Sequence, residues 1–190
     1  MVVTRNPELT NRMKVMRLHG MSRDAFDRFT ATVPSWYYEI VAPGFKYNLT
    51  DIAAALGLHQ LKRAHPFQRR RAEIAAGYDA RLRHLPLQLP PSAAAGDVHA
   101  WHLYVLRLSD AAGVSRDRMI ERLFEAGIGC SVHYVPLHLQ PYWRDRYRLQ
   151  PESFPHSQHA YERMFSLPIH TRLQDADVQR VIDAVRDALA

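Results

Sequence analysis

The sequence predicts an α/β protein whose carboxyl-terminal part, residues 97–190, forms a compact α+β unit. Residues 102–108 alternate between two sets of side chains, as a strand does, and Ser115 precedes a helical pattern that ends at Gly127. A last helix is expected to begin at Asp175, because an apolar stripe follows at helical spacing. The expected order is β-α-β-loop-α-β-α, which can close around one core.

The amino-terminal part is expected to be mainly helical. Val2 and Val3 have the character of a strand end, and a helix capped by asparagine and proline follows over residues 7–20. Residues 21–49 show no regular pattern. A second helix is expected from Thr50-Asp51 to residue 61, and a proline separates it from a third helix over residues 66–84.

The remaining elements follow a proline-rich linker that ends near Gly96. A second strand is expected over residues 128–134, followed by a loop rich in proline, aromatic residues and histidine over 133–143. A helix over residues 157–165, a short extended piece at 167–169 and the last helix over 175–189 complete the chain.

The composition is that of an ordinary globular protein, with 190 residues, 47% hydrophobic and 23% charged. No apolar run approaches the roughly 20 residues that span a bilayer, and the first residues lack the layout of a secretory signal. The single cysteine, Cys130, cannot form an internal disulfide. We therefore expect a cytoplasmic protein with no membrane partner.

The positive charge does not indicate nucleic-acid binding. The net charge is +6, but the basic residues are scattered rather than gathered into a stripe with interleaved aromatics. The one tight run, residues 69–71, lies in a helical pattern beside Glu73. A solvated helix face is the favoured interpretation of this run, and an anion-binding role is the alternative.

The histidines and the cysteine do not predict a metal or a nucleophile. His133 and His138, like the other histidine pairs, lack the i, i+4 spacing of a helical zinc motif, and Cys130 has no cysteine partner. Cys130 and His133 would point to opposite faces of one strand, so we expect a buried or half-buried structural thiol.

The loop at residues 44–51 is more informative. Lys46, Asn48 and Thr50 place a cation, an amide and a hydroxyl just before a helix start, which suits a phosphate group. The alternative is an ordinary Asn/Thr helix cap beside a solvated lysine.

Several spaced motifs resemble one enzyme family. Residues 44–61 carry its loop-and-helix pattern and 18–20 its "L-H-G" helix end. Residues 70–78 match "R-R-x-x-I-A-x-x-Y", and 126–138 contain "G-I-x-x-x-x-H-Y-x-P-x-H". Residues 167–169 continue an "S-L-P" strand that begins at Ser166. Nearly end to end, the sequence resembles the DegT/DnrJ/EryC1/StrS sugar aminotransferases, which are pyridoxal 5'-phosphate enzymes of fold type I.

The resemblance implies the carboxyl-terminal half of such an enzyme. Residues 1–63 would be a remnant of the large domain, 64–96 a connecting helix and linker, and 97–190 the small α+β domain. The family's Schiff-base lysine precedes a "G-E-G-G" turn that would lie ahead of Met1. No catalytic residue is therefore expected in this chain, and Lys14 and Lys46 fall at other family positions.

The resemblance also implies a reaction and a set of contacts. The family transfers an amino group, typically from glutamate, to a keto sugar on a nucleotide, and it works as a homodimer. Residues 46–48 and 98–103 look most like the UDP-4-amino-4-deoxy-L-arabinose–oxoglutarate aminotransferases of lipid A modification.

The expected contacts are of two kinds. Lys46 and Asn48 would bind the phosphate of the partner subunit's cofactor, and His133 and His138 would border the pocket for the UDP-sugar. Trp101 and Tyr134 are expected in the core.

A rival hypothesis comes from a different class. The chain could be a non-catalytic truncated remnant, or one half of a split enzyme whose upstream half-chain carries the lysine. Coding sequence ahead of Met1 would distinguish these cases.

Overall fold

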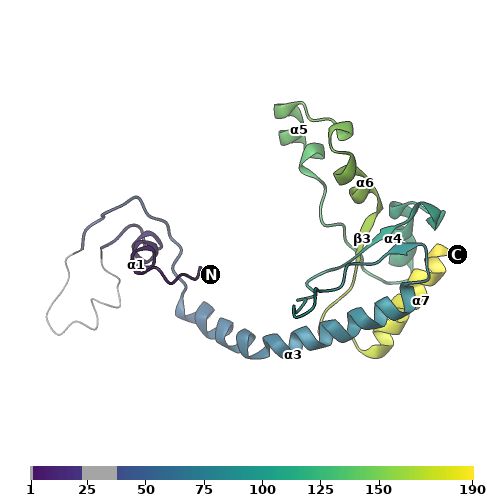
Figure 1. Cartoon of the computed structure of the whole chain (residues 1–190), viewed down its shortest axis with the longest axis horizontal. Coiled ribbons are helices and arrows are strands. Elements are labelled where there is room, and N and C mark those ends of the chain that lie inside the picture. Colours follow the sequence, from purple (N-terminus) through teal and green to yellow (C-terminus); the bar gives the residue numbers. More distant parts are fainter. Residues whose placement is uncertain (1, 23–37) are drawn as a thin grey trace. The chain divides into compact units, whose positions relative to one another are not determined.

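The computed structural model describes residues 2–22 and 38–190 (Figure 1). The chain divides into two compact units, Met1–Lys62 and Arg63–Ala190. Much of the segment expected to be irregular, residues 23–37, lies outside the described residues.

In the first unit, helix α1 spans Pro7–Met16. The side chain of Asn6 caps it by accepting hydrogen bonds from the backbone N–H groups of Glu8 and Leu9. The expected end at Gly20 is wrong, because His19 and Gly20 take positive φ angles of 57° and 75°, which no helix residue does. The expected strand end at residues 2–3 is also wrong, since this segment is exposed and pairs with no strand in the described chain.

Helix α3 runs without a break over Asp51–Leu82, so the expected division at Pro66 is wrong. The hydroxyl of Thr50 accepts a hydrogen bond from the backbone N–H of Ala53 (3.3 Å), as expected for a cap. Proline removes only one helical hydrogen bond, that to the carbonyl of Lys62. Both residues are exposed, so water can satisfy this carbonyl and the helix continues.

The second unit contains a three-stranded antiparallel sheet in the order β1-β2-β3. Strand β1 is Leu87–Gln88, β2 is Tyr104–Leu108 and β3 is Met164–Leu167. Strand β1 lies within the segment expected to be a linker. It was missed because two residues are too short to show an alternating pattern.

The strand expected at residues 128–134 is wrong. Only Ser131 pairs with the sheet, through a single bridge to Ser166 at the outer side of β3. Glycine at 127 and 129 and serine at 131 offer little side-chain area to pack against a neighbouring strand, which weakens pairing.

Three helices cover one face of the sheet. They are α4 (Arg116–Glu125), α7 (Asp175–Leu189) and the carboxyl-terminal half of α3. Ser115 caps α4, and Gly127 ends its final turn with a φ of 75°. The largest fully buried side chains come from these helices and from the sheet: Ile74, Tyr78, Leu82, Tyr104, Leu106, Met119, Leu123, Phe165, Ile182 and Val185.

Between Ser131 and β3 the chain forms a small helical lobe, drawn in green in Figure 1. It contains α5 (Pro141–Tyr147), α6 (Pro155–Arg163) and short 3-10 turns at Leu137–Leu139 and Pro151–Ser153. A further 3-10 turn, Asp110–Ala112, follows β2. Helix α5 begins within the expected loop at residues 133–143, and its two turns are too short for a periodic signal.

Among the described residues, no helix has both the length and the apolar character needed to cross a membrane.

Candidate functional site

The sheet of the second unit has a second face, which the three helices do not cover. Cross-strand partners share a face, and on this face Val105 lies opposite Ser166, which in turn lies opposite Ser131. In the neighbouring row, Arg107 lies between Gln88 and Met164. This uncovered sheet face holds most of the polar side chains of the sheet.

His133 is held at the edge of the uncovered sheet face. Its Nδ1 lies 2.9 Å from the hydroxyl of Ser166, a side chain that is only 5% exposed. The ring packs edge-on against Tyr134, whose side chain is 75% exposed, so the expectation that Tyr134 is a core residue is wrong. Trp101, by contrast, is buried as expected. The Nε2 of His133 has no hydrogen-bond partner in the described chain and can contact a ligand.

His138 lies inside the helical lobe and is 4% exposed. Its Nε2 is 2.9 Å from Oε1 of Gln158, and the amide nitrogen of Gln158 donates to Glu162 (2.7 Å). The Gln158 oxygen therefore accepts, and Nε2 of His138 carries the proton. The ring stacks on Phe154, with 4.9 Å between centroids, beside an apolar cavity of about 470 Å³.

Lys46 and Asn48 lie in the first unit, on an extended segment that pairs with the residues just after α1. The backbone of Gly44 packs directly against that of Gly20. A Cβ atom on Gly44 would overlap the Gly20 backbone, and a Cβ atom on Gly20 would overlap the carbonyl of Ala42. The backbone N–H of Phe45 donates to the carbonyl of Met16 at 2.7 Å, which continues this pairing.

The side chains of this segment alternate between two sides. Phe45 and Tyr47 stack on one side with ring centroids 5.1 Å apart, so Lys46 and Asn48 project to the other. Lys46 is exposed and Asn48 half-buried, just ahead of the start of α3. Thr50 is the cap of that helix, so the amide of Asn48 remains available, without a hydrogen bond in the described chain.

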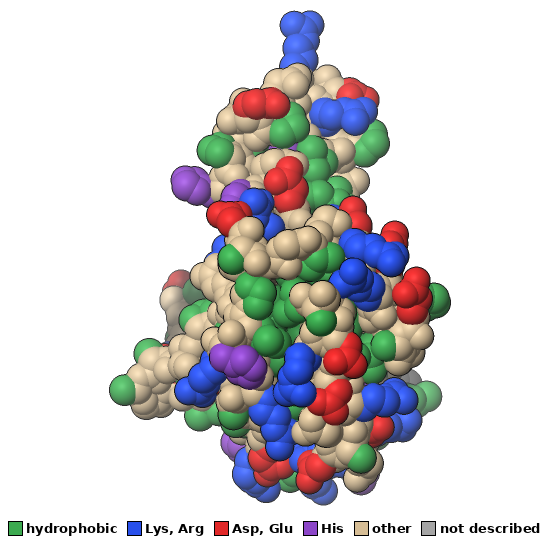
Figure 2. Space-filling model, turned by 90° about the vertical axis from the view of Figure 1, so that its right-hand side faces the viewer, with side chains coloured by type: hydrophobic (Ala, Val, Ile, Leu, Met, Phe, Trp, Pro, Cys, Tyr) green, Lys and Arg blue, Asp and Glu red, His purple; other side chains and the backbone are tan. Residues whose placement is uncertain are grey.

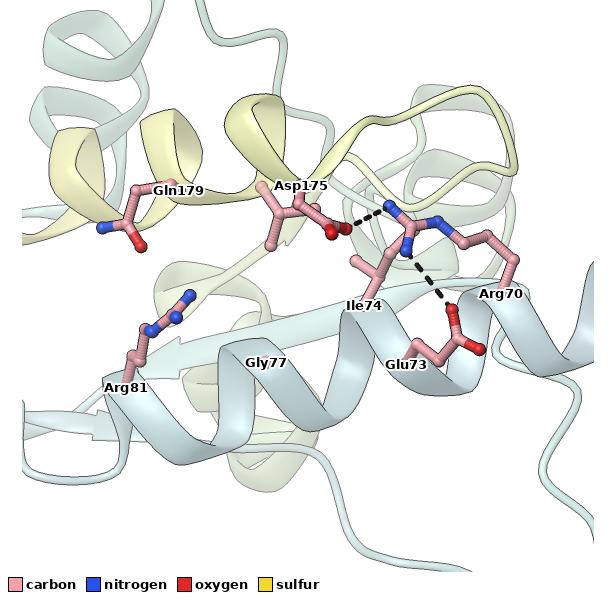
Figure 3. A pocket seen from close by; sticks show the side chains of 8 residues that line it. Arg70, Glu73, Ile74, Gly77, Arg81, Asp175 and Gln179 are labelled. Atoms are coloured by element: carbon pink, nitrogen blue, oxygen red, sulfur yellow. Dashed lines mark hydrogen bonds and ion pairs between the residues drawn. The ribbon is translucent and has the colours of Figure 1, made fainter.

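Arg69 and Arg70, in the arginine run at residues 69–71, have different roles. Arg69 is exposed, as expected of a solvated helix face. Arg70 instead joins α3 to the start of α7: it donates to the carbonyl of Leu173 (2.7 Å) and pairs with Asp175 (2.8 Å) and Glu73 (3.3 Å). Figure 3 shows this contact at one end of a groove of about 390 Å³ between the two helices.

The remaining candidates carry no chemistry of their own. Burial raises the pKa of the Cys130 thiol to about 11, which keeps it protonated and unreactive, as expected of a structural cysteine. No group of three or more potential metal ligands occurs in the described part of the chain. On the face shown in Figure 2, cationic and anionic side chains are interspersed.

Comparison with known proteins identifies the family. Residues 1–186 match the sequence profile of the DegT/DnrJ/EryC1/StrS aminotransferase family. The chain belongs to this family. It is 43% identical over 189 residues to the spore coat polysaccharide biosynthesis protein SpsC of Bacillus subtilis, a match that covers 98% of this chain and 48% of SpsC.

Solved structures agree with this assignment. The PMP-form of Spr1654 from Streptococcus pneumoniae, described as a candidate sugar aminotransferase, is similar with a TM-score of 0.85 and 30% identity, covering 98% of this chain and 47% of that one. PseC of Helicobacter pylori, an aminotransferase involved in the biosynthesis of pseudoaminic acid, is similar with a TM-score of 0.83 and 28% identity. The match covers 98% of this chain and 47% of PseC. The chain therefore spans about half the length of the relatives that it matches.

Proposed function

We propose that the chain is the carboxyl-terminal half of a pyridoxal-phosphate-dependent sugar aminotransferase that moves an amino group from glutamate to a nucleotide-linked keto sugar. The observation that carries this proposal is the family match over residues 1–186. The similarity to SpsC, whose name refers to polysaccharide biosynthesis, and to PseC supports a sugar as the acceptor.

The described residues fit the phosphate of such a cofactor. Lys46 offers a charge and Asn48 an amide, both on one side of an extended segment, and a helix begins three residues further on. A phosphate gains from a cation, from N–H donors and from a nearby helix start. When bound, the pyridoxal ring supplies an electron sink for the transfer, and the protein supplies position and charge.

The lysine that holds the cofactor is proposed to come from outside residues 1–190. Lys14, Lys46 and Lys62 are all exposed, whereas a lysine that acts as a nucleophile needs a desolvated or strongly charged setting. The proposed arrangement is a cytoplasmic homodimer in which the Lys46 segment of one subunit reaches the cofactor of its partner. An upstream half-chain is a second possible source of the lysine.

The proposed acceptor is a UDP-4-keto-pentose. Residues 46–48 and 98–103 favour the UDP-4-amino-4-deoxy-L-arabinose subtype and a role in lipid A modification. His133 would contact the sugar through its free Nε2, because Ser166 occupies the other ring nitrogen. His138 is buried, so it would shape the wall of the pocket.

A chimera tests the proposal. The part of SpsC that the match leaves out is placed ahead of Met1, and oxoglutarate is measured with glutamate, pyridoxal phosphate and a panel of UDP- and dTDP-linked 4-keto sugars. Intact SpsC serves as the positive control. We expect turnover, fastest with the UDP-4-keto-pentose. A folded, cofactor-loaded chimera that produces no oxoglutarate with any sugar would contradict the proposal and favour a non-catalytic chain.

A further inference from the structure

A cavity of about 570 Å³ lies over the uncovered sheet face, between β2 and the segment that follows β1. Arg107 lines it from the central strand and is only half exposed. Within the described chain, its guanidinium makes no hydrogen bond, ion pair or ring contact. A half-buried arginine loses part of its hydration, which an anionic partner in the cavity would replace.

Two neutral donors share the cavity with Arg107. Gln88 lies directly opposite Arg107 in the register of β1 and β2, so the two side chains stand next to each other on one face. His99 completes the set; two contacts orient its ring and a third holds its backbone.

The fixed orientation of His99 makes it a donor. Its Nδ1 accepts a hydrogen bond from the backbone N–H of Trp101 (2.9 Å), and its ring packs on that indole with centroids 4.1 Å apart. The amide of Gln68 donates to the His99 carbonyl at 3.1 Å. Because Nδ1 accepts, Nε2 of the neutral ring carries the proton.

The walls of the cavity are apolar. They consist of Leu89, Leu103 and Val105 with the two prolines that follow Leu89. None of the described residues that line the cavity is acidic, so nothing there competes for the guanidinium. Low polarity around a cation strengthens its attraction for an anion.

We propose that this pocket binds the oxyanion group, carboxylate or phosphate, of a small organic molecule. Arg107 supplies the charge, Gln88 and His99 supply neutral N–H donors, and the apolar walls accommodate the carbon skeleton. Planar guanidinium groups suit both kinds of oxyanion, since either accepts two parallel hydrogen bonds. The pocket lies within residues 63–190, and this assignment does not depend on the proposed aminotransferase activity.

The test is a nuclear magnetic resonance titration of the full 190-residue chain, labelled with ¹⁵N. Inorganic phosphate, glutamate and UDP are added separately to about 10 mM, tenfold above the dissociation constant of a millimolar site. We expect at least one of them to cause saturable shifts of the Arg107 Nε–H signal and of backbone amides at 87–91, 99 and 103–107. Response to glutamate alone identifies a carboxylate site, and response to UDP or phosphate a phosphate site.

Variants make the test specific. Arg107→Gln should weaken binding by about tenfold or more, the effect of losing a charged hydrogen-bond partner. Arg81→Gln is the control, because Arg81 likewise has no partner in the described chain but is exposed and lines a different groove. It should bind like the parent.

Three results would overturn the proposal: no saturable shift with any probe, shifts spread over all arginine-rich surfaces, or equal affinity of the Arg107→Gln variant. If that variant does not fold, Gln88→Ala replaces it. Gln88 is exposed, and its loss should weaken binding without unfolding the sheet.

Discussion

Replacing Arg70 with glutamine should destabilise the second unit, because this side chain ties α3 to the beginning of α7 (Figure 3). The substitution removes the hydrogen bond to the carbonyl of Leu173, a residue that is 9% exposed. A charged hydrogen bond to a partly buried carbonyl contributes about 1.5–3 kcal/mol.

The two ion pairs of Arg70 add less. The carboxylates of Glu73 and Asp175 are 64% and 94% exposed, and exposed pairs contribute about 0–1 kcal/mol each. We therefore expect Arg70→Gln to lower the free energy of unfolding by about 2–3 kcal/mol. In a double-mutant cycle with Asp175→Asn, the coupling should be about 0.5–1 kcal/mol.

Urea unfolding measures this change in a parent chain and variants that carry Trp36→Phe and Trp143→Phe, so that the fluorescence comes from buried Trp101 of the second unit. Arg69→Gln is the control, since it alters the same charge on the same helix at an exposed position. It should shift stability by no more than about 0.5 kcal/mol. Equal unfolding free energies for the two variants would refute the reasoning and show that Arg70 is a solvated surface residue.

Three further predictions follow. Gly77→Ala should raise the unfolding free energy by about 0.5–1 kcal/mol, because alanine favours a helix and its Cβ would lie in ordinary contact, 3.8 Å from a methyl of Val178; a loss of stability in urea would contradict it. Cys130 should react slowly with Ellman's reagent at pH 8. Because its folded pKa of about 11 exceeds that of an unfolded thiol, stability should fall as pH rises from about 9 to 11, and Cys130→Ala should lose less; fast labelling or a flat profile would show an open thiol. The isolated chain should form no oxoglutarate from glutamate, pyridoxal phosphate and a UDP-4-keto-pentose; turnover, or a borohydride-fixed cofactor adduct on Lys14 or Lys62, would contradict the proposed origin of the lysine.

The parts of the fold that sequence patterns predicted are those with local signals. Ser115 and Gly127 bound α4 as expected, because capping and helix termination depend on residues within one turn. The prediction of a strand at residues 128–134 was wrong because strand pairing depends on a partner distant in sequence, and only Ser131 pairs with β3. The break predicted at Pro66 was wrong for a related reason. Whether a proline ends a helix depends on whether water can hydrogen-bond to the carbonyl that the proline leaves unpaired.

The candidate site divides in the same way. The proposed roles of Lys46 and Asn48 rest on a local pattern, a cation and an amide before a helix start, and they stay a prediction. The pairing of Gln88 with Arg107, and the support of His138 by Gln158, could not be predicted, since each joins residues that only the register or the tertiary fold brings together. Arg107 within an alternating strand gave no sign that it would lack a partner.

The central claim is that this chain contributes the phosphate-binding segment of a sugar aminotransferase. The most direct measurement is the dissociation constant of pyridoxal phosphate for the chimera and for its Lys46→Ala variant. Loss of a charged hydrogen bond to the phosphate should weaken binding by about 10- to 100-fold. Lys62→Ala, which removes an exposed lysine on α3 rather than on the segment ahead of it, should leave the constant unchanged. Equal dissociation constants for the parent and Lys46→Ala would contradict the account and show that Lys46 is a surface lysine with no part in the site.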